Sequence, residues 1–139
     1  MTPLSHLILR TDLPEITPAT TVKHACEIMR DCRASAALVV SKDGLLVGIF
    51  TGRDAIWRVH ADGRNPAKLR LTEVMTPSPT TIGPNATAIE ALRLMWDGNF
   101  RHLPVINQGK VVGVVMRRDF KSEDLRRLES ERELWEHMR

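Results

Sequence analysis

The sequence predicts an α/β (α+β) fold in which two pseudo-twofold related β-α-β-β-α repeats share one hydrophobic core. The chain of 139 residues repeats itself, because the pattern that begins at Ile16 recurs 66 positions later, at Ile82. In each copy an amphipathic helical stripe is followed by two strand-length apolar runs. The composition, 42% hydrophobic and 27% charged, is typical of a globular protein rather than a disordered or fibrous one.

The two copies align along most of their length. Ile16-Thr17-Pro18 corresponds to Ile82-Gly83-Pro84, and the offset holds through the first helix and strand. One residue is then missing at the turn, so that Gly44 corresponds to Gly109. The predicted division is residues 12–66 for the first repeat, 67–122 for the second and 123–139 for a helical tail.

Each copy is expected to begin with a short extended segment, at Ile16 or Ile82, and to continue into a helix. Thr21 and Thr87 are suitable N-caps for these helices. Apolar residues then follow with the spacing of one helical face: Val22, Ala25, Cys26 and Met29 in the first copy, and Ala88, Ala91, Leu92 and Met95 in the second. These stripes indicate that both helices pack against a sheet.

Two strands are predicted after each helix: Ala37–Val40 and Leu45–Phe50, then Leu103–Ile106 and Lys110–Val115. Gly44 and Gly109 mark the turns between them. A second helix is predicted to begin near Thr51 and to end by Gly63. Residues 61–81, which contain three prolines, are expected to join the copies.

Charge and composition exclude several classes of function. The net charge is +3, but residues 117–139 hold equal numbers of acidic and basic side chains, so no basic arm points to nucleic acid. Aromatic residues make up only 4%, too few for a base-stacking platform. A modest positive field favours an anionic small molecule. No apolar run approaches the length of a membrane span.

The expected location is the cytoplasm. The first residues lack the order of a signal peptide, and Cys26 and Cys32 lie too far apart on one helix to form a disulfide. The five histidines show no metal-ligand spacing, and no nucleophile-elbow or phosphate-loop motif occurs. We therefore expect neither catalytic residues nor a metal site, and a protein that is not an enzyme.

Several motifs together make the chain resemble the cystathionine β-synthase (CBS) domain family as a tandem pair, over roughly residues 12–122. These motifs are Val74-Met75-Thr76-Pro77, the pattern Pro-x-x-Thr-x-x-x-Ala-x-x-x-Met in both helices, Phe100-Arg101-His102-Leu103-Pro104-Val105, and Gly48-Ile49-Phe50-Thr51-Gly52-Arg53-Asp54. The resemblance implies a regulatory Bateman module that forms a homodimer. It also implies clefts between the repeats that bind an adenosyl ligand: AMP, ATP or S-adenosylmethionine.

Thr51, Arg53 and Asp54 are the first candidate ligand residues. They stand where a strand turns into a helix, and free N–H groups at a helix start suit a phosphate. Asp54 can accept the hydroxyls of a ribose, and the resemblance assigns phosphate to the threonine and ribose to the aspartate. The alternative is that Thr51 and Asp54 form a capping box, in which both side chains satisfy backbone donors. The two roles can also coexist.

The second copy departs from this pattern. Met116 replaces the threonine and can neither cap a helix nor donate to phosphate, whereas Asp119 keeps the acid and Arg118 adds charge. Arg101 and His102 precede the matching strand, where the resemblance implies contacts with phosphate. Because they alternate along the chain, they point to opposite faces. The alternatives are a surface ion pair for Arg101 and a half-buried, hydrogen-bonded histidine.

The remaining candidates would line an apolar slot for adenine: Ile16, Thr17 and Ile82. Val39 and Val105 are expected to be core instead. The tail is expected to dock on the module or its dimer mate, or to contact a regulated protein partner. Because the two copies keep different pieces of ligand chemistry, we expect at most one competent cleft. The alternative function is a dimeric protein-interaction module whose degenerate clefts hold no ligand.

Overall fold

The structure is a computed structural model that describes Leu4, residues 9–120 and six residues of the tail. These six are Arg126, Glu129, Ser130, Glu133, Leu134 and His137; all are helical and exposed. The rest of the helix predicted over 123–139 lies outside the described residues. The described chain forms two compact units. We call Asp12–Pro79 the first-repeat unit, and the residues up to Thr11 together with those from Thr80 onward the second-repeat unit.

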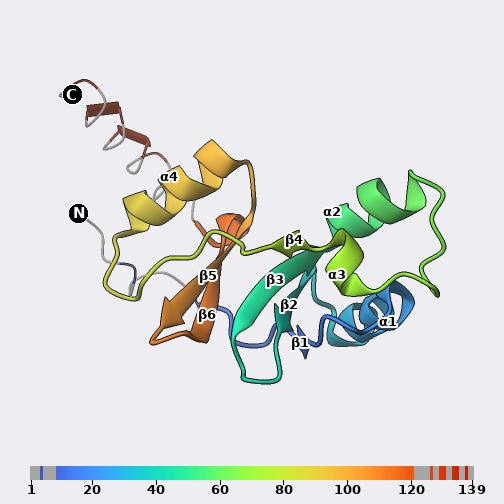
Figure 1. The fold of residues 1–139 in the computed structure, drawn as a ribbon. Coiled ribbons are helices and arrows are strands. Elements are labelled where there is room, and N and C mark those ends of the chain that lie inside the picture. The colour runs from blue at the N-terminus through green and yellow to red at the C-terminus, as the bar shows by residue number, and fades with distance from the viewer. Residues whose placement is uncertain are drawn as a thin grey trace. The chain divides into compact units, whose positions relative to one another are not determined.

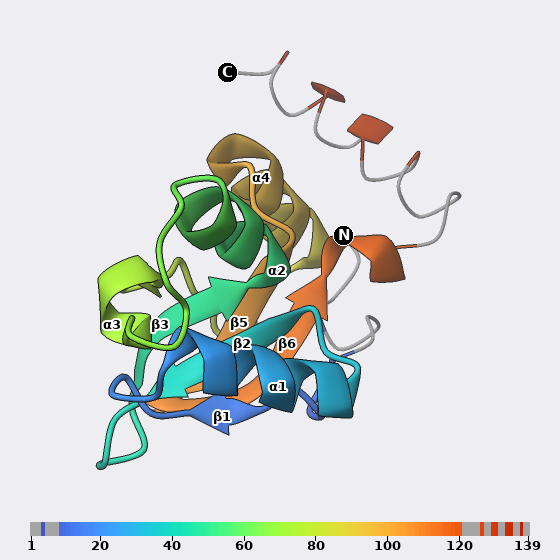
Figure 2. The ribbon, with the colours of Figure 1, turned by 90° about the vertical axis from the view of Figure 1, so that its right-hand side faces the viewer.

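The first-repeat unit is built on a four-stranded sheet in the order β1-β2-β3-β4 (Figure 1). Its elements are β1 (Glu15–Ile16), α1 (Val22–Cys32), β2 (Ala36–Val40), β3 (Leu46–Thr51), α2 (Gly52–Asp54), η2 (Ala55–His60), α3 (Leu71–Val74) and β4 (Thr76–Pro77). β1 pairs with β2 in parallel, and the other two pairings are antiparallel. Figure 2 shows α1 running alongside the β1–β2 pair.

Local signals account for the ends of α1. The hydroxyl of Thr21 accepts a hydrogen bond from the His24 amide at 3.2 Å, as an N-cap does. The helix ends at Arg33, whose backbone is left-handed. The predicted turn at Gly44 is confirmed, with a φ of 79° that favours glycine. α2 continues into η2, whose wider π-helical turn is closed by the Ala61 amide donating to the Ile56 carbonyl at 2.8 Å.

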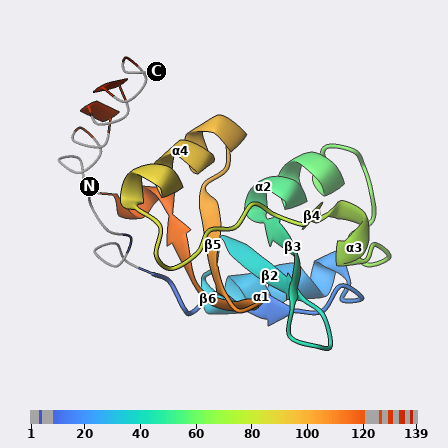
Figure 3. The same cartoon turned by 60° about the vertical axis from the view of Figure 1, so that its left-hand side comes forward.

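The second-repeat unit contains α4 (Ala88–Gly98), β5 (His102–Asn107), β6 (Lys110–Met116) and η3 (Arg117–Asp119). Figure 3 shows α4 lying beside the β5–β6 hairpin. Ile82 forms a parallel bridge to Val105, as Ile16 does to Val39 in the other unit. Directly after β6, Arg117–Asp119 form a 3₁₀ turn rather than the start of an α-helix. Met116 makes no side-chain cap there, unlike Thr51 at the start of α2.

Each unit includes the segment that comes just before the other repeat in the sequence. Arg10 pairs with Val114 of β6, and β4, from the predicted connecting segment, pairs with β3. Met75 lies against Gly48 of β3, and Leu9 lies against Gly113 of β6. In both units a side chain from the added segment therefore packs on a glycine of a strand. The structure thus gives residues 66–79 a helix and a strand that the sequence did not reveal. The repeat boundaries at 12–66 and 67–122 describe the sequence period and stay a prediction.

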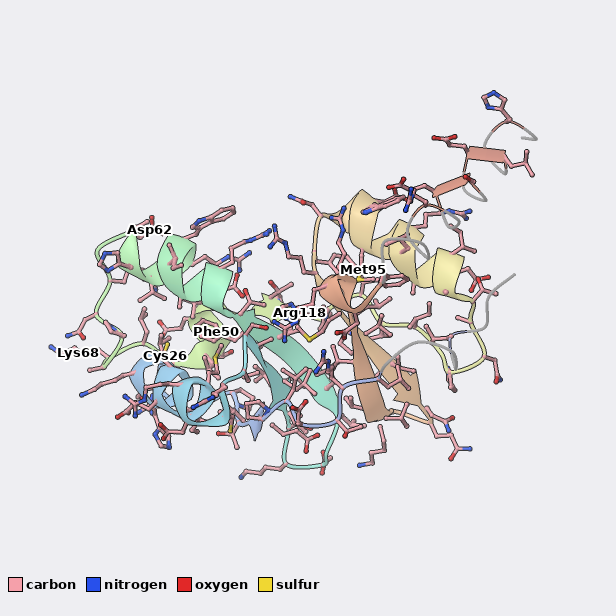
Figure 4. All side chains as sticks on the ribbon, turned by 180° about the vertical axis from the view of Figure 1, so that it is seen from behind. Cys26, Phe50, Asp62, Lys68, Met95 and Arg118 are labelled. Atoms are coloured by element: carbon pink, nitrogen blue, oxygen red, sulfur yellow. The ribbon has the colours of Figure 1, made fainter. Side chains whose placement is uncertain are left out.

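Each unit contains its own cluster of buried apolar side chains, and the expectation that the two repeats share one core stays a prediction. The first-repeat unit has its own buried apolar cluster: Ile16, Val22, Ala25, Met29, Ala37, Val39, Phe50, Val59, Leu69, Leu71 and Val74. Another forms in the second-repeat unit: Leu4, Ile82, Ala88, Ile89, Ala91, Leu92, Met95, Leu103, Val105, Val115 and Phe120. Figure 4 labels Phe50 and Met95, one from each cluster. Each helix buries its stripe within its own unit.

Cys26 and Cys32 are free thiols. Cys26 lies on α1 (Figure 4), half-buried against the first cluster, and this burial raises the pKa of its thiol. Cys32 is exposed at the end of α1. Among the described residues, no helix is long and apolar enough to cross a membrane.

Candidate functional site

The turn at the end of β3 holds Thr51 and Asp54 in a reciprocal pair of hydrogen bonds. The Asp54 amide donates to Thr51 Oγ1 at 3.2 Å, and the Thr51 amide donates to Asp54 Oδ2 at 3.0 Å. The capping box that the sequence suggested is therefore formed. The Gly52 amide donates to the carbonyl of Ser35 at 3.0 Å, which ties the turn to the start of β2.

The capping box leaves hydrogen-bonding capacity unused. A hydroxyl has one donor hydrogen as well as acceptor lone pairs, and Thr51 uses only an acceptor in the cap. A carboxylate has about four lone-pair sites, of which one at Oδ2 of Asp54 serves the cap. The cap and a contact with ligand hydroxyls or phosphate are therefore compatible. Asp54 is only 8% exposed, so a ligand would meet the edge of this carboxylate.

Arg58 is a neighbour of Asp54 that the sequence analysis missed. Its Nε lies 3.6 Å from Oδ1 of Asp54, across one helical turn. Its Nη1 donates to the carbonyls of Val74 and Met75, each at 3.3 Å. Arg58 therefore connects the candidate acid to the C-terminal end of α3 and the start of β4. The four-residue spacing of Asp54 and Arg58 was a signal that could have found this contact.

Arg53 is placed against an aromatic ring. Its guanidinium carbon lies 5.1 Å from the centroid of the Trp57 ring, within the range of a cation–π contact. Trp57 and Ile56 are 62% and 59% exposed, so this part of η2 shows solvent an unusual amount of apolar surface. Arg53 would have to turn away from Trp57 to reach a phosphate at the helix start.

The other two candidates of the first-repeat unit differ in burial. Ile16 is 5% exposed and belongs to the apolar cluster, with its backbone paired to β2. Thr17 is exposed, and its hydroxyl oxygen lies 2.8 Å from that of Thr20. Of these two, only Thr17 presents a polar group to solvent.

In the second-repeat unit Asp119 is held by an arginine that the sequence analysis did not name. Arg10 Nε donates to Asp119 Oδ2 at 3.0 Å, and Arg10 Nη2 donates to Oδ1 in a short ion pair. These hydrogen bonds hold the pKa of Asp119 below its usual range, and the neighbouring Arg118 lowers it further. Both oxygens of this acid thus accept from a guanidinium, whereas Oδ2 of Asp54 serves the cap and Oδ1 lies 3.6 Å from the Arg58 guanidinium, beyond hydrogen-bond distance.

The remaining candidates lie around the ends of β5 and β6. Arg101 and Arg118 are exposed, and His102 is half-buried at the start of β5, opposite Met116. Figure 4 labels Arg118 in the turn that follows β6. The Arg117 amide donates to the Arg101 carbonyl at 3.0 Å, which brings the two candidate segments of this unit together. Ile82, with 9% exposure, belongs to the core, as do Val39 and Val105, both fully buried as expected.

Arg10 could not have been found from spacing. It lies 109 positions before Asp119, and nothing in the sequence around either residue marks the pair. Among the described residues no cluster of three or more histidine, cysteine or acidic side chains could hold a metal ion.

A family model described as the CBS domain matches residues 5–61 and 71–126. The chain is 40% identical over 100 residues to the CBS domain-containing protein CBSCBSPB2 of Arabidopsis thaliana. That alignment covers 72% of this chain and 19% of the plant protein, so the chain spans about a fifth of this relative's length.

Solved structures share the fold over most of both chains. A conserved protein from Pyrococcus horikoshii has a TM-score of 0.78 and 28% identity, covering 85% of this chain and 88% of that one. The CBS domain protein PAE2072 from Pyrobaculum aerophilum, solved in complex with AMP, also has a TM-score of 0.78. It is 22% identical and covers 88% of this chain and 95% of its own, a likeness that shows the fold.

Proposed function

The chain belongs to the CBS domain family, as a tandem pair of CBS domains, and from this we propose that it is a regulatory module that binds an adenosyl ligand at the turn formed by Thr51 and Asp54. The observation that carries the proposal is the geometry of this turn. A threonine hydroxyl with its hydrogen still available and a carboxylate with unused lone pairs lie side by side at a helix start. In this arrangement Thr51 donates to a phosphate and Asp54 accepts from ribose hydroxyls.

AMP is the first ligand to test, because the Pyrobaculum protein of the same fold was solved with AMP. ATP and S-adenosylmethionine are the alternatives, since they carry the same ribose; S-adenosylmethionine has no phosphate, so it could use only the contact with Asp54. The module acts without catalysis: the ligand favours one arrangement of the protein by binding it more tightly than the others. A regulated partner protein reads that arrangement, and neither nucleic acid nor a membrane is involved.

The proposal includes a homodimer. Ile56 and Trp57, neighbours on η2, are both more than half exposed in the single chain. Burying a tryptophan and an isoleucine at an interface removes a large apolar area from water. Asp12–Pro79 supplies both residues, so the dimer contact and the candidate ligand turn belong to the same unit.

A dimeric interaction module without a ligand is the second candidate. Two observations favour it in the second repeat: Met116 lacks the hydroxyl, and the carboxylate of Asp119 is engaged by Arg10. In the first repeat the capping box alone would explain why Thr51 and Asp54 are there.

The test compares two carboxylates that each close a capping box. Glu90 closes a capping box with Thr87 at the start of α4, as Asp54 does with Thr51. Asp54→Ala and Glu90→Ala should each lower the free energy of unfolding by about 1 kcal/mol through the lost cap, and Asp54→Ala also removes the carboxylate beside Arg58. Only Asp54→Ala should abolish AMP binding.

Thermal unfolding and titration calorimetry with AMP, ATP and S-adenosylmethionine provide the readout. A ligand at 100 times its Kd should stabilise the wild type and Glu90→Ala by about 2.7 kcal/mol. The proposal fails if no ligand shifts the wild type at millimolar concentration, or if Asp54→Ala binds as well as Glu90→Ala.

A further inference from the structure

The second-repeat acid is engaged within its own unit. The guanidinium of Arg10 reaches Asp119 through two nitrogens, Nε to Oδ2 at 3.0 Å and Nη2 to Oδ1. The side chain of Asp119 is only 7% exposed, and that of Arg10 is 34% exposed. A bidentate arginine–carboxylate contact is among the stronger polar contacts in proteins, because donor and acceptor are both charged and their geometries match.

The backbone delivers Arg10 to this position. The Arg10 amide donates to the Val114 carbonyl at 2.8 Å, and the Val114 amide donates to the Arg10 carbonyl at 2.9 Å. Next to it, Leu9 packs where β6 has Gly113, and a methyl group at that glycine would lie 3.0 Å from Leu9 Cβ. The backbone of Arg10 is thus fixed beside β6 by two hydrogen bonds to Val114 and by the packing of Leu9 against Gly113.

A ribose would therefore compete with a charged donor for Asp119. Hydrogen bonds from neutral hydroxyls are weaker than those from a guanidinium, so displacing Arg10 costs more than the ribose returns. The low pKa of Asp119 agrees with this, since it reflects a carboxylate stabilised by Arg10. The second-repeat turn also lacks a hydroxyl, because Met116 stands where the first repeat has Thr51 and cannot donate a hydrogen bond to a phosphate.

We propose that Arg10 is an internal plug: it occupies the second-repeat acid in place of a ligand, so that the chain offers one adenosyl site instead of two. The inference rests on the proposed function of the first-repeat turn and concerns a different residue set. The plug belongs to the segment that precedes the first repeat, which joins the second-repeat unit. Any event that pulls this segment from β6 frees Asp119.

The test first removes ligand binding at the first-repeat turn and then frees Asp119 in the second-repeat unit. In an Asp54→Ala background, we expect Arg10→Gln combined with Met116→Thr to bind AMP at one per chain by titration calorimetry. Met116→Thr alone should bind none in that background, because the plug remains. Arg30→Gln combined with Met116→Thr is the matched control, since Arg30 pairs with its neighbour Asp31 on exposed α1 surface.

Each outcome decides between the two proposals. A wild type that binds two AMP per chain, or an Asp119→Ala variant that binds less AMP than the wild type, overturns the plug. So does a combined Arg10→Gln variant that folds and gains no site. A wild type that binds no AMP overturns the first-repeat proposal. The plug is then decided by whether the combined Arg10→Gln and Met116→Thr variant binds AMP. If Arg10→Gln does not fold, Arg10→Lys replaces it, because it keeps the charge and loses the fork.

Discussion

The contact between Gly48 and Met75 can be tested by adding a single methyl group. A Cβ built on Gly48 would lie 2.4 Å from the Met75 sulfur and 3.0 Å from its Cγ and Cε. Carbon atoms pack best at about 3.5–4.0 Å, so Met75 must leave its place over β3. Overpacking of this kind costs typically about 1–3 kcal/mol. Because Met75 is flexible and half-buried, we expect Gly48→Ala to lower the free energy of unfolding by about 1–2 kcal/mol.

A double-mutant cycle in urea separates the clash from other effects. Met75→Ala removes the atoms that the new methyl would meet, so Gly48→Ala should cost close to nothing in that background. The expected coupling between the two substitutions is therefore about 1–2 kcal/mol. Gly83→Ala is the control, because a Cβ there meets nothing within 4 Å and should change stability by less than about 0.5 kcal/mol.

The reasoning is refuted if Gly48→Ala costs the same with and without Met75. That result would mean that the glycine is needed for its backbone alone, although its φ is not in the left-handed region. The same cycle applies to Gly113 and Leu9 in the second-repeat unit.

Two further predictions concern the polar contacts. Arg58→Ala removes two hydrogen bonds to the end of α3, so the free energy of unfolding in urea should fall by about 1 kcal/mol, and an unchanged value would show that these bonds are not formed in solution. Arg10 keeps the pKa of Asp119 in the folded protein below its unfolded value near 3.9. The stability from this pair is therefore present above about pH 4 and lost as the pH falls through the folded pKa, and urea titrations from pH 7 to pH 2 should show a smaller acid-induced loss in Arg10→Gln than in the wild type.

The sequence was most informative where one short segment decides the structure. The caps at Thr21 and Thr87, the turns at Gly44 and Gly109, and the capping box at Thr51 all depend on residues within three positions of each other. The predicted strands were confirmed to within about one residue at each end. The internal repeat helped, because each copy supported the interpretation of the other.

Contacts between distant segments could not be found in this way. α3 and β4 are too short to show a hydrophobic period: α3 forms where Leu71 and Val74 are buried in the first cluster, and β4 forms by pairing with β3. The partner of Asp119 is an arginine near the opposite end of the chain. The repeat pattern likewise shows which side chains are buried but not which other side chains they pack against.

The crossing of Leu9 and Arg10 into the second-repeat unit also affects the order in which the protein can fold during synthesis. Asp12–Pro79 is one continuous stretch, so it can fold as soon as Pro79 has left the ribosome. Arg10 is made earlier than all of these residues, yet its partner Asp119 is made 109 positions later. At about 5–20 residues per second, Arg10 waits roughly 5–20 s for this partner. The contacts of Leu9 and Arg10 with β6 are thus completed after the first-repeat unit, although these two residues precede that unit in the sequence.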